Sequence, residues 1–461
     1  MKRIAIVGGG LSGLSAAYQL VHEPQVEFTL FEASPRLGGI VETVRRDGFV
    51  IECGPDSWVT EKPWARELAV ELGLEAEIIP SNDQQRRTYI LRHNQLIPMP
   101  DGMRMMVPAQ LAAIMESPLF SEQARLAYRS EPKRAEELKA SALKQDQDES
   151  VGSFVRRHFG DEVTRTVAGP LLAGVFGGDI ETLSVRAVMP AFVKMEREYG
   201  SLILALQSRA DENGNALLTS LRSGLGTLIE RIAAALPAGC VRLSHEVTRL
   251  DRTDQGWRVY ARSSEQPFDA VIVATPAHVT QRLLRPIHKQ FGSLLAMEAT
   301  SAIVVAVAFT PEQTRGLKIP RGFGYLVPQH RGTDSQLLAC TFVDQKFSHR
   351  APDGGILLRG FFGGDVAEAL LNENDETLTT LALQRLSDVL GPLPSPHLSV
   401  VRRWPLSLPQ YAVGHLERMA RLEALVGSFP GLHLAGNAYH GVGLPDMVRM
   451  GREAARYAAR A

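Results

Sequence analysis

The sequence has few of the features that would mark a secreted, membrane-spanning or nucleic-acid-binding protein. Its three cysteines, Cys53, Cys240 and Cys340, lie far apart and form no CxxC pair. Neither a disulfide framework nor a zinc site is therefore expected. Lys and Arg number 50 and Asp and Glu number 51, which leaves a formal charge of −1. This balance gives no indication of a polyanionic partner, so we expect no nucleic-acid binding.

Long hydrophobic runs are also missing. The apolar run at the N-terminus stops at Val7, where glycines replace the hydrophobic region of a signal peptide. No window reaches the roughly 18 uninterrupted apolar residues that a membrane-spanning helix needs. We therefore expect a cytoplasmic protein, with peripheral contact to the inner face of the cell membrane as an alternative. At 461 residues the chain is too long for one hydrophobic core, so two or three domains are expected.

The first residues contain a dinucleotide-binding pattern. Arg3–Val7 (RIAIV) predicts a short buried parallel strand, and the GxGxxG motif Gly8–Gly13 and a helical pattern follow it. In such a motif, Gly8 makes the tight turn, Gly10 lets the backbone approach a pyrophosphate, and Gly13 lets the helix pack closely on the strand. The helix N-terminus then presents the positive end of its dipole to the phosphates.

The residues that follow distinguish FAD from NAD. A second strand, Glu27–Phe31, ends in Glu32, an acid placed to accept hydrogen bonds from a ribose diol. It opens an ExxxRxGG extension that is typical of flavoproteins rather than NAD-dependent dehydrogenases. There Arg36 would reach the pyrophosphate, while Gly38 and Gly39 would bring a second backbone segment against the cofactor. This continuation indicates FAD; the alternative is a surface turn with an exposed arginine.

Two later segments extend the same domain. Asp269–Pro276 (DAVIVATP) predicts another buried strand, and Gly431–Asn437 predicts a strand that runs into a glycine turn. The stretch His440–Asp446 and a helix over Met447–Ala459 come next. The N–H groups at the start of that helix would face the pyrimidine ring or the ribityl chain of the flavin. The FAD-binding domain is therefore predicted to be discontinuous.

Between these segments lie a helical pattern, from about Leu96 to Gly178, and a pattern of strands with one helix, Asp375–Leu390. The apolar stretch 96–120 predicts a membrane-dipping surface, a pocket mouth or core. The charged stretch 130–149 predicts an exposed helix or loop. The expected strands are Ser301–Phe309, Phe323–Val327, Leu337–Val343 and Gly355–Phe362.

The fold class expected is α/β, with a Rossmann-like FAD-binding domain, an α+β substrate-binding domain and a helical inserted domain. We assign residues 1–80, 220–295 and 425–461 to FAD binding. Residues 81–95, 180–219 and 296–424 form the expected substrate-binding domain. Residues 96–179 form the helical domain, for which membrane association is an alternative.

Four further blocks make the chain resemble the oxygen-dependent protoporphyrinogen oxidase family, within the flavin amine oxidase superfamily. The resemblance covers nearly the whole chain. Two departures are small: Phe176 stands where a tyrosine is common, and Gly177 replaces a frequent alanine. The four blocks are Glu52–Ser57 (ECGPDS), Pro170–Ser184 (PLLAGVFGGDIETLS), Trp404–His415 (WPLSLPQYAVGH) and Gly436–Gly443 (GNAYHGVG).

The resemblance implies a six-electron oxidation of a porphyrinogen to a porphyrin, with dioxygen as acceptor and hydrogen peroxide as product. Because the flavin carries the redox chemistry, no catalytic side chain and no metal are expected. A homodimer is common among such relatives. We favour protoporphyrinogen IX as substrate, with coproporphyrinogen III as the alternative. The second would demand extra cations, for which Arg87, Arg92 and Arg104 are candidates.

Other interpretations stay open. A flavin amine oxidase or a carotenoid desaturase would share the cofactor motifs, and Lys318 and Lys346 are candidates for the lysine that amine oxidases place near the flavin. A non-catalytic flavin-binding or porphyrin-carrying protein and an NAD-dependent dehydrogenase are further alternatives. The histidines His415, His433 and His440 are expected to be structural rather than catalytic bases.

The expected site residues fall into two sets. For the apolar members of the substrate set, ordinary core is the alternative, and Arg87 is the candidate partner of a substrate carboxylate. The cofactor-binding set is Gly8, Gly10, Leu11, Ser12, Gly13, Glu32, Ala33, Arg36, Leu37, Gly38, Gly39, Gly54, Pro55, Asp56, Ser57, Val247, Ala274, Thr275, Trp404, Gly436, Gly441, Val442 and Gly443. The substrate-binding set is Arg87, Leu172, Gly174, Phe176 and Met195.

Overall fold

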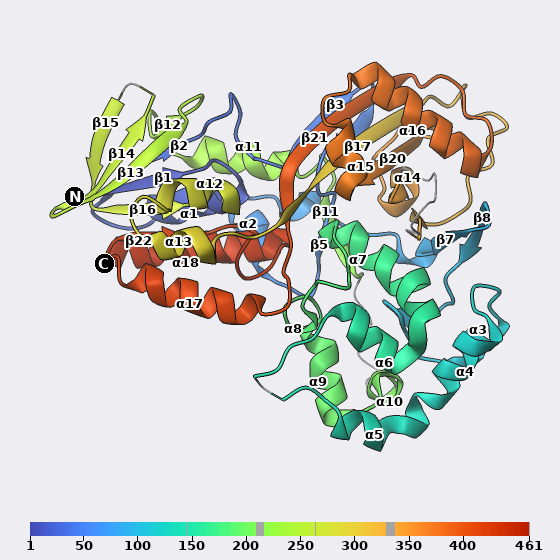
Figure 1. Ribbon diagram of the computed structural model, residues 1–461. Helices are drawn as coiled ribbons and strands as arrows, with labels where there is room; N and C mark the ends of the chain where they lie inside the picture. The colour runs from blue at the N-terminus through green and yellow to red at the C-terminus, as the bar shows by residue number, and fades with distance from the viewer. Residues whose placement is uncertain (145, 209–215, 263, 329–336, 461) are drawn as a thin grey trace. The chain divides into compact units, whose positions relative to one another are not determined.

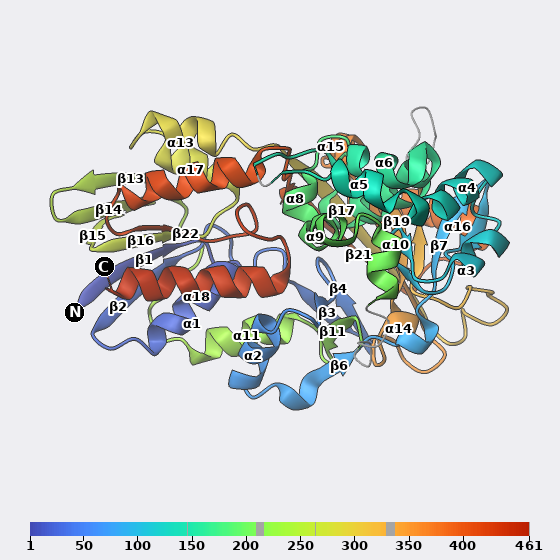
Figure 2. The ribbon, with the colours of Figure 1, turned by 90° about the horizontal axis from the view of Figure 1, so that it is seen from below.

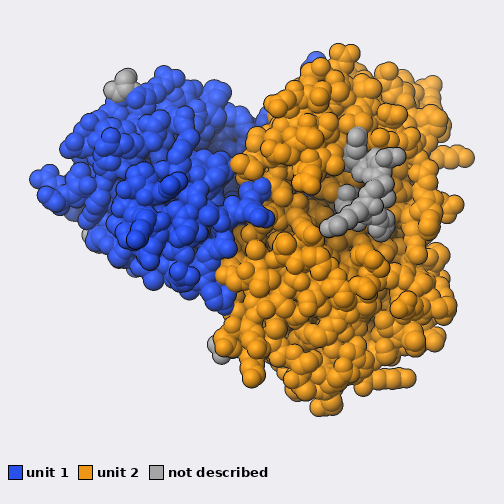
Figure 3. All heavy atoms as spheres, in the orientation of Figure 1, with its two compact units in different colours: residues 1–81, 217–299, 417–461 blue, residues 82–216, 300–416 orange. Residues whose placement is uncertain are grey.

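The computed structural model describes residues 1–144, 146–208, 216–262, 264–328 and 337–460. They form two compact units, each assembled from separate stretches of the chain (Figure 3). Unit 1 comprises residues 1–81, 217–299 and 417–461, and unit 2 comprises residues 82–216 and 300–416. Outside the FAD-binding domain, a substrate-binding domain and a helical domain were expected. This division is finer than the two units and stays a prediction.

Unit 1 is built on a parallel sheet, which confirms the α/β fold class and its Rossmann-like core (Figure 1). Each neighbouring pair of its strands is parallel. The central strand is apolar on both faces, as a sheet covered on both sides requires, and Ile4, Ala5 and Ile6 are fully buried. The strand order is β12 (Val241–Arg242), β2 (Val26–Phe31), β1 (Lys2–Val7), β16 (Ala270–Val273) and β22 (Leu432–Leu434).

Two helices from opposite ends of the chain pack side by side against this sheet. They are α1 (Leu11–Val21) and α18 (Leu444–Arg460) (Figure 2). A Cβ at Gly451 of α18 would overlap the carbonyl oxygen of Ser12, so only glycine permits this approach. The N-terminal and C-terminal segments are thereby joined in one layer.

Shorter elements complete unit 1. The helices are α2 (Trp64–Glu71), α11 (Gly226–Ala235), α12 (Ala277–Leu284), α13 (Lys289–Leu294) and most of α17 (His415–Gly427). An antiparallel sheet consists of β13 (Val247–Thr253), β14 (Gly256–Ala261) and β15 (Ser264–Phe268). Two smaller sheets consist of β3 (Thr43–Arg46) with β4 (Phe49–Glu52), and of β5 (Trp58–Val59), β11 (Leu218–Leu221) and β6 (Ile78–Pro80).

Unit 2 contains a seven-stranded sheet in which β7 (Thr88–Arg92) runs parallel to β18 (Gly324–Leu326). The pairs between β17 (Ala299–Phe309), β20 (Ile356–Gly363), β19 (Ala339–Phe342) and β18 are antiparallel. Alternate residues of β17, Ile303, Val305 and Val307, enter one core, as the two-residue period of a strand requires. The helix α16 (Asp375–Leu390) packs on β21. The strand order is β21 (Leu398–Pro409), β17 (Ala299–Phe309), β20 (Ile356–Gly363), β19 (Ala339–Phe342), β18 (Gly324–Leu326), β7 (Thr88–Arg92) and β8 (Gln95–Pro98).

The helical part of unit 2 begins later than the sequence pattern predicted. Residues 96–108 were expected to be helical, but they contribute to β8, β9 (Met103–Arg104) and β10 (Val107–Pro108). Prolines without an N–H group explain the difference, since Pro98, Pro100 and Pro108 interrupt any helical ladder. The remaining elements are α3 (Leu111–Glu116), α4 (Glu122–Ser130), α5 (Ala135–Ala140), α6 (Val151–Val163), a π-helical turn (Thr164–Ala168), α7 (Gly169–Phe176), α8 (Val185–Val188), α9 (Pro190–Tyr199), α10 (Leu202–Gln207), α14 (Val343–Lys346) and α15 (Gly364–Leu370).

The apolar stretch 96–120 contributes to the core of unit 2. Met106, Val107, Ile114 and Leu119 are fully buried. Among the described residues, no helix is long and apolar enough to cross a membrane. Peripheral membrane contact by this stretch stays a prediction.

The charged stretch 130–149 is only partly the exposed helix or loop that was expected, because Glu131 is completely buried. Its carboxylate lies 3.0 Å from Nδ1 of His158, whose Nε2 lies 3.0 Å from Oε1 of Glu196. Arg157 also donates to Glu196, and the Leu202 N–H donates to Glu131 at 2.7 Å. Burial of these charges is tolerated because each carboxylate is hydrogen-bonded. Charge pairing, rather than apolar packing alone, holds α6, α9 and α10 together.

This network predicts an acid-sensitive contribution to stability. Burial opposes ionisation of Glu196, but hydrogen bonds from His158 and Arg157 outweigh it, and the pKa of Glu196 is lowered. The stabilisation is therefore complete above the unfolded-state pKa and is lost as the pH falls through the folded-state pKa. We expect Glu196→Gln to destabilise unit 2 by about 1–3 kcal/mol at pH 7, with a gap from wild type that narrows below about pH 4.

Thermal unfolding measured by circular dichroism across this pH range tests the prediction. The exposed Glu198→Gln on the same helix is the matched control and should unfold close to wild type. A Glu196→Gln protein as stable as the control at pH 7 would show that the network contributes nothing.

Candidate FAD-binding site

The glycine-rich loop after β1 has the geometry of a phosphate-binding turn. Gly8 has a φ of 107°, which L-residues rarely adopt, and a Cβ at Gly13 would overlap the Gly8 carbonyl oxygen. Gly10 differs from both, because the nearest atom to a Cβ built there is the Cα of Gly39 at 4.0 Å. Gly8 and Gly13 are thus required by the fold itself. Gly10 instead leaves open space at the start of α1.

That open space faces unsatisfied donors. Gly10 is the N-cap of α1 and provides no side chain to cap it, so the first-turn N–H groups keep their capacity for an anion. The hydroxyl of Ser12 in this turn is buried and has no hydrogen-bond partner among the described residues. An orphaned buried hydroxyl beside an uncapped helix N-terminus fits a pyrophosphate oxygen.

Glu32 and Arg36 hold the loop in place. The Glu32 carboxylate at the end of β2 accepts from the Gly9 N–H at 2.6 Å and from the Ser34 N–H at 2.8 Å. The Arg36 guanidinium donates to the carbonyl oxygens of Leu37, at 3.1 Å, and Gly39, and it pairs with Glu42 at 3.3 Å. Each Glu32 oxygen retains acceptor capacity for a ribose diol. A contact of Arg36 with pyrophosphate stays a prediction, because the Arg36 guanidinium donates hydrogen bonds to carbonyl oxygens of the second glycine segment.

That second segment lies directly against the first. Gly38 pairs with Gly10 in an isolated parallel bridge, and its N–H donates to the Gly9 carbonyl at 2.8 Å. Gly38 and Gly39 have φ values of 106° and 57°, and a Cβ on Gly38 would lie 2.6 Å from the Val41 carbonyl oxygen. Ala33 and Leu37 belong to the same turn. The ExxxRxGG extension therefore meets the GxGxxG loop backbone to backbone.

The ECGPDS block forms a further wall of unit 1. Glu52 is fully buried, accepts from the Thr43 hydroxyl at 2.6 Å and accepts from the Leu225 N–H at 2.7 Å. A Cβ at Gly54 would overlap the Ile40 carbonyl oxygen. The Asp56 carbonyl accepts from the Ser220 hydroxyl at 2.7 Å. Pro55 and Ser57 of this turn are half-buried. Ala274 and Thr275, which follow β16, are also half-buried.

The C-terminal glycine turn is braced by an ion pair. Asp446, in the first turn of α18, is buried, and its carboxylate lies 2.6 Å from the ammonium of Lys62. Gly441 has a φ of 119°, and a Cβ there would overlap the Asp446 side chain. Gly436, Val442 and Gly443 surround this turn. The pair therefore determines where the turn lies at the start of α18.

Other expected residues are less informative. Val247 begins β13 with its side chain in the core of unit 1, so only its backbone is available to a cofactor. Trp404 lies on β21 in unit 2, and its cofactor contact stays a prediction. Burial lowers the pKa of His433 to about 4, so this side chain is neutral at pH 7. His415 stacks on Tyr411 with ring centroids 3.9 Å apart, and His440 pairs with Glu423.

The expected substrate-binding residues all lie in unit 2. Leu172, Phe176 and Met195 are buried, and Gly174 packs near Leu326. Arg87 is exposed immediately before β7, and its side chain makes no hydrogen bond to the described residues. No ligand contact is thereby assigned, so this set stays a prediction.

Two of the resemblance blocks meet in unit 2. The Gln410 amide donates to the Phe176 carbonyl at 2.7 Å, and the Ser184 N–H donates to the Tyr411 carbonyl at 2.7 Å. Leu183 and Ala412 form an antiparallel bridge. Of the lysines considered for an amine oxidase, Lys318 is exposed, and Lys346 lies 5.3 Å from the Phe347 ring centroid.

Comparison with known proteins agrees with this geometry. The family described as flavin containing amine oxidoreductase matches residues 11–459. The chain belongs to this family. Coproporphyrinogen III oxidase of Bacillus subtilis (strain 168) is 33% identical and aligns over 98% of this chain and 97% of its own. Protoporphyrinogen oxidase of Bos taurus is 30% identical and aligns over 98% of both chains.

Solved structures give the same result. A crystal structure from Exiguobacterium sp. 255-15, provisionally described as a protoporphyrinogen oxidase, covers 100% of this chain and 99% of its own with a TM-score of 0.86 and 32% identity. A putrescine oxidase bound to putrescine has a TM-score of 0.70 at 19% identity, which shows the shared fold alone. The protein is therefore a flavin-dependent oxidoreductase of the porphyrinogen oxidase family. The expected cofactor, FAD, is confirmed, and the NAD alternative is dropped.

Sequence reasoning did not identify three residues that shape this site. Lys62 and Asp446 are 384 positions apart, and no local pattern links them. The sequence did offer a clue to Gly451, because a glycine inside a predicted helix is unfavourable unless a close approach requires it.

Gly10→Val provides the direct test of the loop. Because a Cβ at Gly10 meets no atom closer than 4.0 Å, the variant should fold, yet its branched side chain would fill the space beside the helix N-terminus. We expect purified Gly10→Val to keep the wild-type circular dichroism spectrum and lose its flavin absorbance. A folded variant with full flavin occupancy would show that no pyrophosphate binds at Gly10.

Substitutions of Lys62 that remove or keep its positive charge test the role of the Lys62–Asp446 ion pair. Lys62→Met leaves the buried Asp446 carboxylate without its cation, which should displace the Gly441–Gly443 turn and weaken FAD binding about tenfold. Lys62→Arg keeps the charge and should restore most of the affinity. FAD titration of apoprotein measures both variants, and equal affinity for Met, Arg and wild type would contradict the bracing role.

Proposed function

We propose that the protein oxidises coproporphyrinogen III to coproporphyrin III, with FAD as cofactor and dioxygen as acceptor, in porphyrin and heme biosynthesis. The observation that carries the substrate choice is the set of bacterial relatives. The coproporphyrinogen III oxidases of Bacillus subtilis, Staphylococcus aureus and Propionibacterium freudenreichii are 33%, 30% and 31% identical, each over 98% of this chain. This reverses the preference for protoporphyrinogen IX drawn from the sequence.

Protoporphyrinogen IX is the second candidate. The Bos taurus protoporphyrinogen oxidase is also 30% identical across 98% of the chain. The two substrates share a macrocycle and differ at two side chains, vinyl in one and propionate in the other. Both oxidations remove six electrons and six hydrogens, which reduce three dioxygen molecules to three hydrogen peroxide molecules.

In this proposal the residues of unit 1 bind and orient the cofactor. FAD, when bound, supplies the hydride acceptor and then passes electrons to dioxygen. The α1 N-terminus, Gly10 and Ser12 would hold the pyrophosphate, and Glu32 would accept from the ribose. The turn Gly441–Gly443 would hold the flavin end, braced by Lys62 and Asp446. These roles use backbone donors, the buried Ser12 hydroxyl and carboxylates already held by hydrogen bonds or an ion pair, which need little reorganisation when the cofactor binds.

Arg87 is the proposed partner of a substrate carboxylate. Its guanidinium is exposed and makes no hydrogen bond to the described residues, so it is free to form a bidentate pair with a propionate. The neighbouring Arg86 instead lies 3.7 Å from Asp83. Cytoplasmic location, peripheral membrane contact and a homodimer accompany this proposal as predictions.

The test is turnover of both porphyrinogens under oxygen, followed by porphyrin fluorescence and corrected for autoxidation. We expect a higher kcat/KM with coproporphyrinogen III than with protoporphyrinogen IX. Arg87→Ala should raise the KM for coproporphyrinogen III about tenfold with a smaller change in kcat, because it removes a charged hydrogen bond in binding.

Arg86→Ala is the matched control and should leave KM close to wild type. Fluorescence that rises no faster than autoxidation with either substrate would refute the porphyrinogen oxidase activity. A preference for protoporphyrinogen IX would refute the substrate choice alone.

A further inference from the structure

Unit 2 contains a cleft that the cofactor site does not use. Its volume is about 920 Å³, which is within the range of small-molecule sites. The end of β7, helices α4 and α6, the π-helical turn 164–168 and the residues after β18 line it. Every lining residue that the structure describes belongs to unit 2, and none of these is an expected FAD-binding residue.

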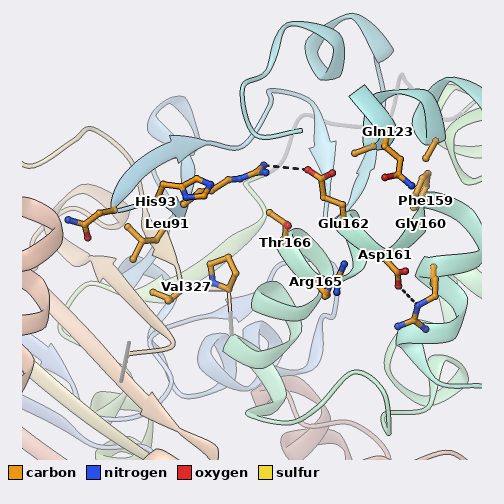
Figure 4. A pocket seen from close by; sticks show the side chains of 16 residues that line it. Leu91, His93, Gln123, Phe159, Gly160, Asp161, Glu162, Arg165, Thr166 and Val327 are labelled. Atoms are coloured by element: carbon orange, nitrogen blue, oxygen red, sulfur yellow. Dashed lines mark hydrogen bonds and ion pairs between the residues drawn. The ribbon is translucent and has the colours of Figure 1, made fainter. Parts of the chain in front are cut away.

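A local break in the helices lies in the wall of the cleft. Gly160 interrupts α6 with φ 79° and ψ 176°, and a Cβ there would meet no atom within 4 Å. The π-helical turn Thr164–Ala168 follows directly, and the Thr164 hydroxyl donates to the Gly160 carbonyl at 2.9 Å. π-Helical turns are rare and occur frequently at functional sites. Figure 4 shows Arg165 and Thr166 of this turn among the lining side chains.

The charges around the cleft do not balance. Arg92 pairs with Glu162 at 3.4 Å, and Arg156 pairs with Asp161 at 2.6 Å, as the dashed lines of Figure 4 mark. Both acids among the described lining residues are thereby matched to a cation. Arg165 is exposed and forms no hydrogen bond or ion pair with any described residue. Among the described lining residues, Arg165 acts on Asp161 only electrostatically, and more weakly than the hydrogen-bonded Arg156, so its guanidinium donors remain available to an anion.

The rest of the described lining combines polar residues, such as Asn94 and Gln123, with apolar ones. Leu91 on the strand side and Ala127 on the helix side are half-buried, whereas Val327, Phe159 and Ala124 are already buried. A small inorganic anion would leave Leu91 and Ala127 in contact with water. An anion with an apolar body would cover them and still reach Arg165.

From this arrangement we infer that the cleft binds an amphipathic carboxylate, with Arg165 holding the carboxylate and Leu91 and Ala127 contacting the apolar body. Two sources share this chemistry: a porphyrin carboxylate and a fatty acid. The porphyrin source rests on the proposed function. The fatty-acid source does not.

Calorimetric titration of the FAD-loaded full chain tests the site with two probes, coproporphyrin III and dodecanoate. We expect Arg165→Ala to weaken binding of at least one probe about tenfold. Arg129→Ala removes an exposed arginine of α4 that does not line the cleft, and it should match wild type. Ala127→Trp fills the cleft without changing charge and should also weaken binding.

The probe whose affinity depends on Arg165 identifies the source. Wild type that binds neither probe overturns the inference, as does equal affinity in wild type, Arg165→Ala and Ala127→Trp. Because binding is measured directly, the two proposals fail separately. Turnover without Arg165-dependent binding overturns only the cleft, and Arg165-dependent binding without turnover overturns only the proposed function.

Discussion

Unit 1 depends on close contact between backbone segments that no side chain separates. Gly13 lies against the Gly8 carbonyl, Gly451 lies against the Ser12 carbonyl, and Gly38 lies against the loop around Gly10. These three contacts fix α1, α18 and the second glycine segment around one turn. Uncapped N–H groups at the start of α1 consequently point to a defined place, which a dinucleotide pyrophosphate requires.

Buried charge has different uses in the two units. In unit 1, the half-buried Glu32 and the buried Glu52 and Asp446 each hold a loop or turn through backbone donors, a hydroxyl or one lysine. In unit 2, His158 of α6 lies between two buried carboxylates, and through Glu196 and Glu131 the network reaches α9 and α10. The first arrangement shapes a cofactor site. The second replaces part of an apolar core, and its cost of desolvation is offset only while all members remain hydrogen-bonded.

Features that depend on residues close together in the sequence could be predicted, and features that depend on residues far apart could not. The GxGxxG loop, the acid at Glu32 and the helix Asp375–Leu390 depend on neighbours in sequence, so spacing alone revealed them. The discontinuous cofactor unit was also predictable, because each of its three parts carries its own strand and glycine turn. The Lys62–Asp446 pair and the burial of Glu131 depend on partners distant in the chain, and no local pattern contains them. The strands in 96–108 were not predicted, because the apolar spacing of this stretch resembles that of a helix. Its three prolines oppose a helix.

The choice of substrate has to come from residues outside the cofactor site. A putrescine oxidase shares this fold at 19% identity, so the architecture that holds FAD does not select a porphyrinogen. Coproporphyrinogen III and protoporphyrinogen IX present nearly the same apolar macrocycle, and a hydrophobic wall discriminates poorly between such bodies. A cation left without its carboxylate, in contrast, costs about 1–3 kcal/mol, or roughly ten- to a hundredfold in binding. Discrimination between the two substrates therefore depends on the number of guanidinium groups, Arg87 among them, that pair with the two additional propionates of coproporphyrinogen III.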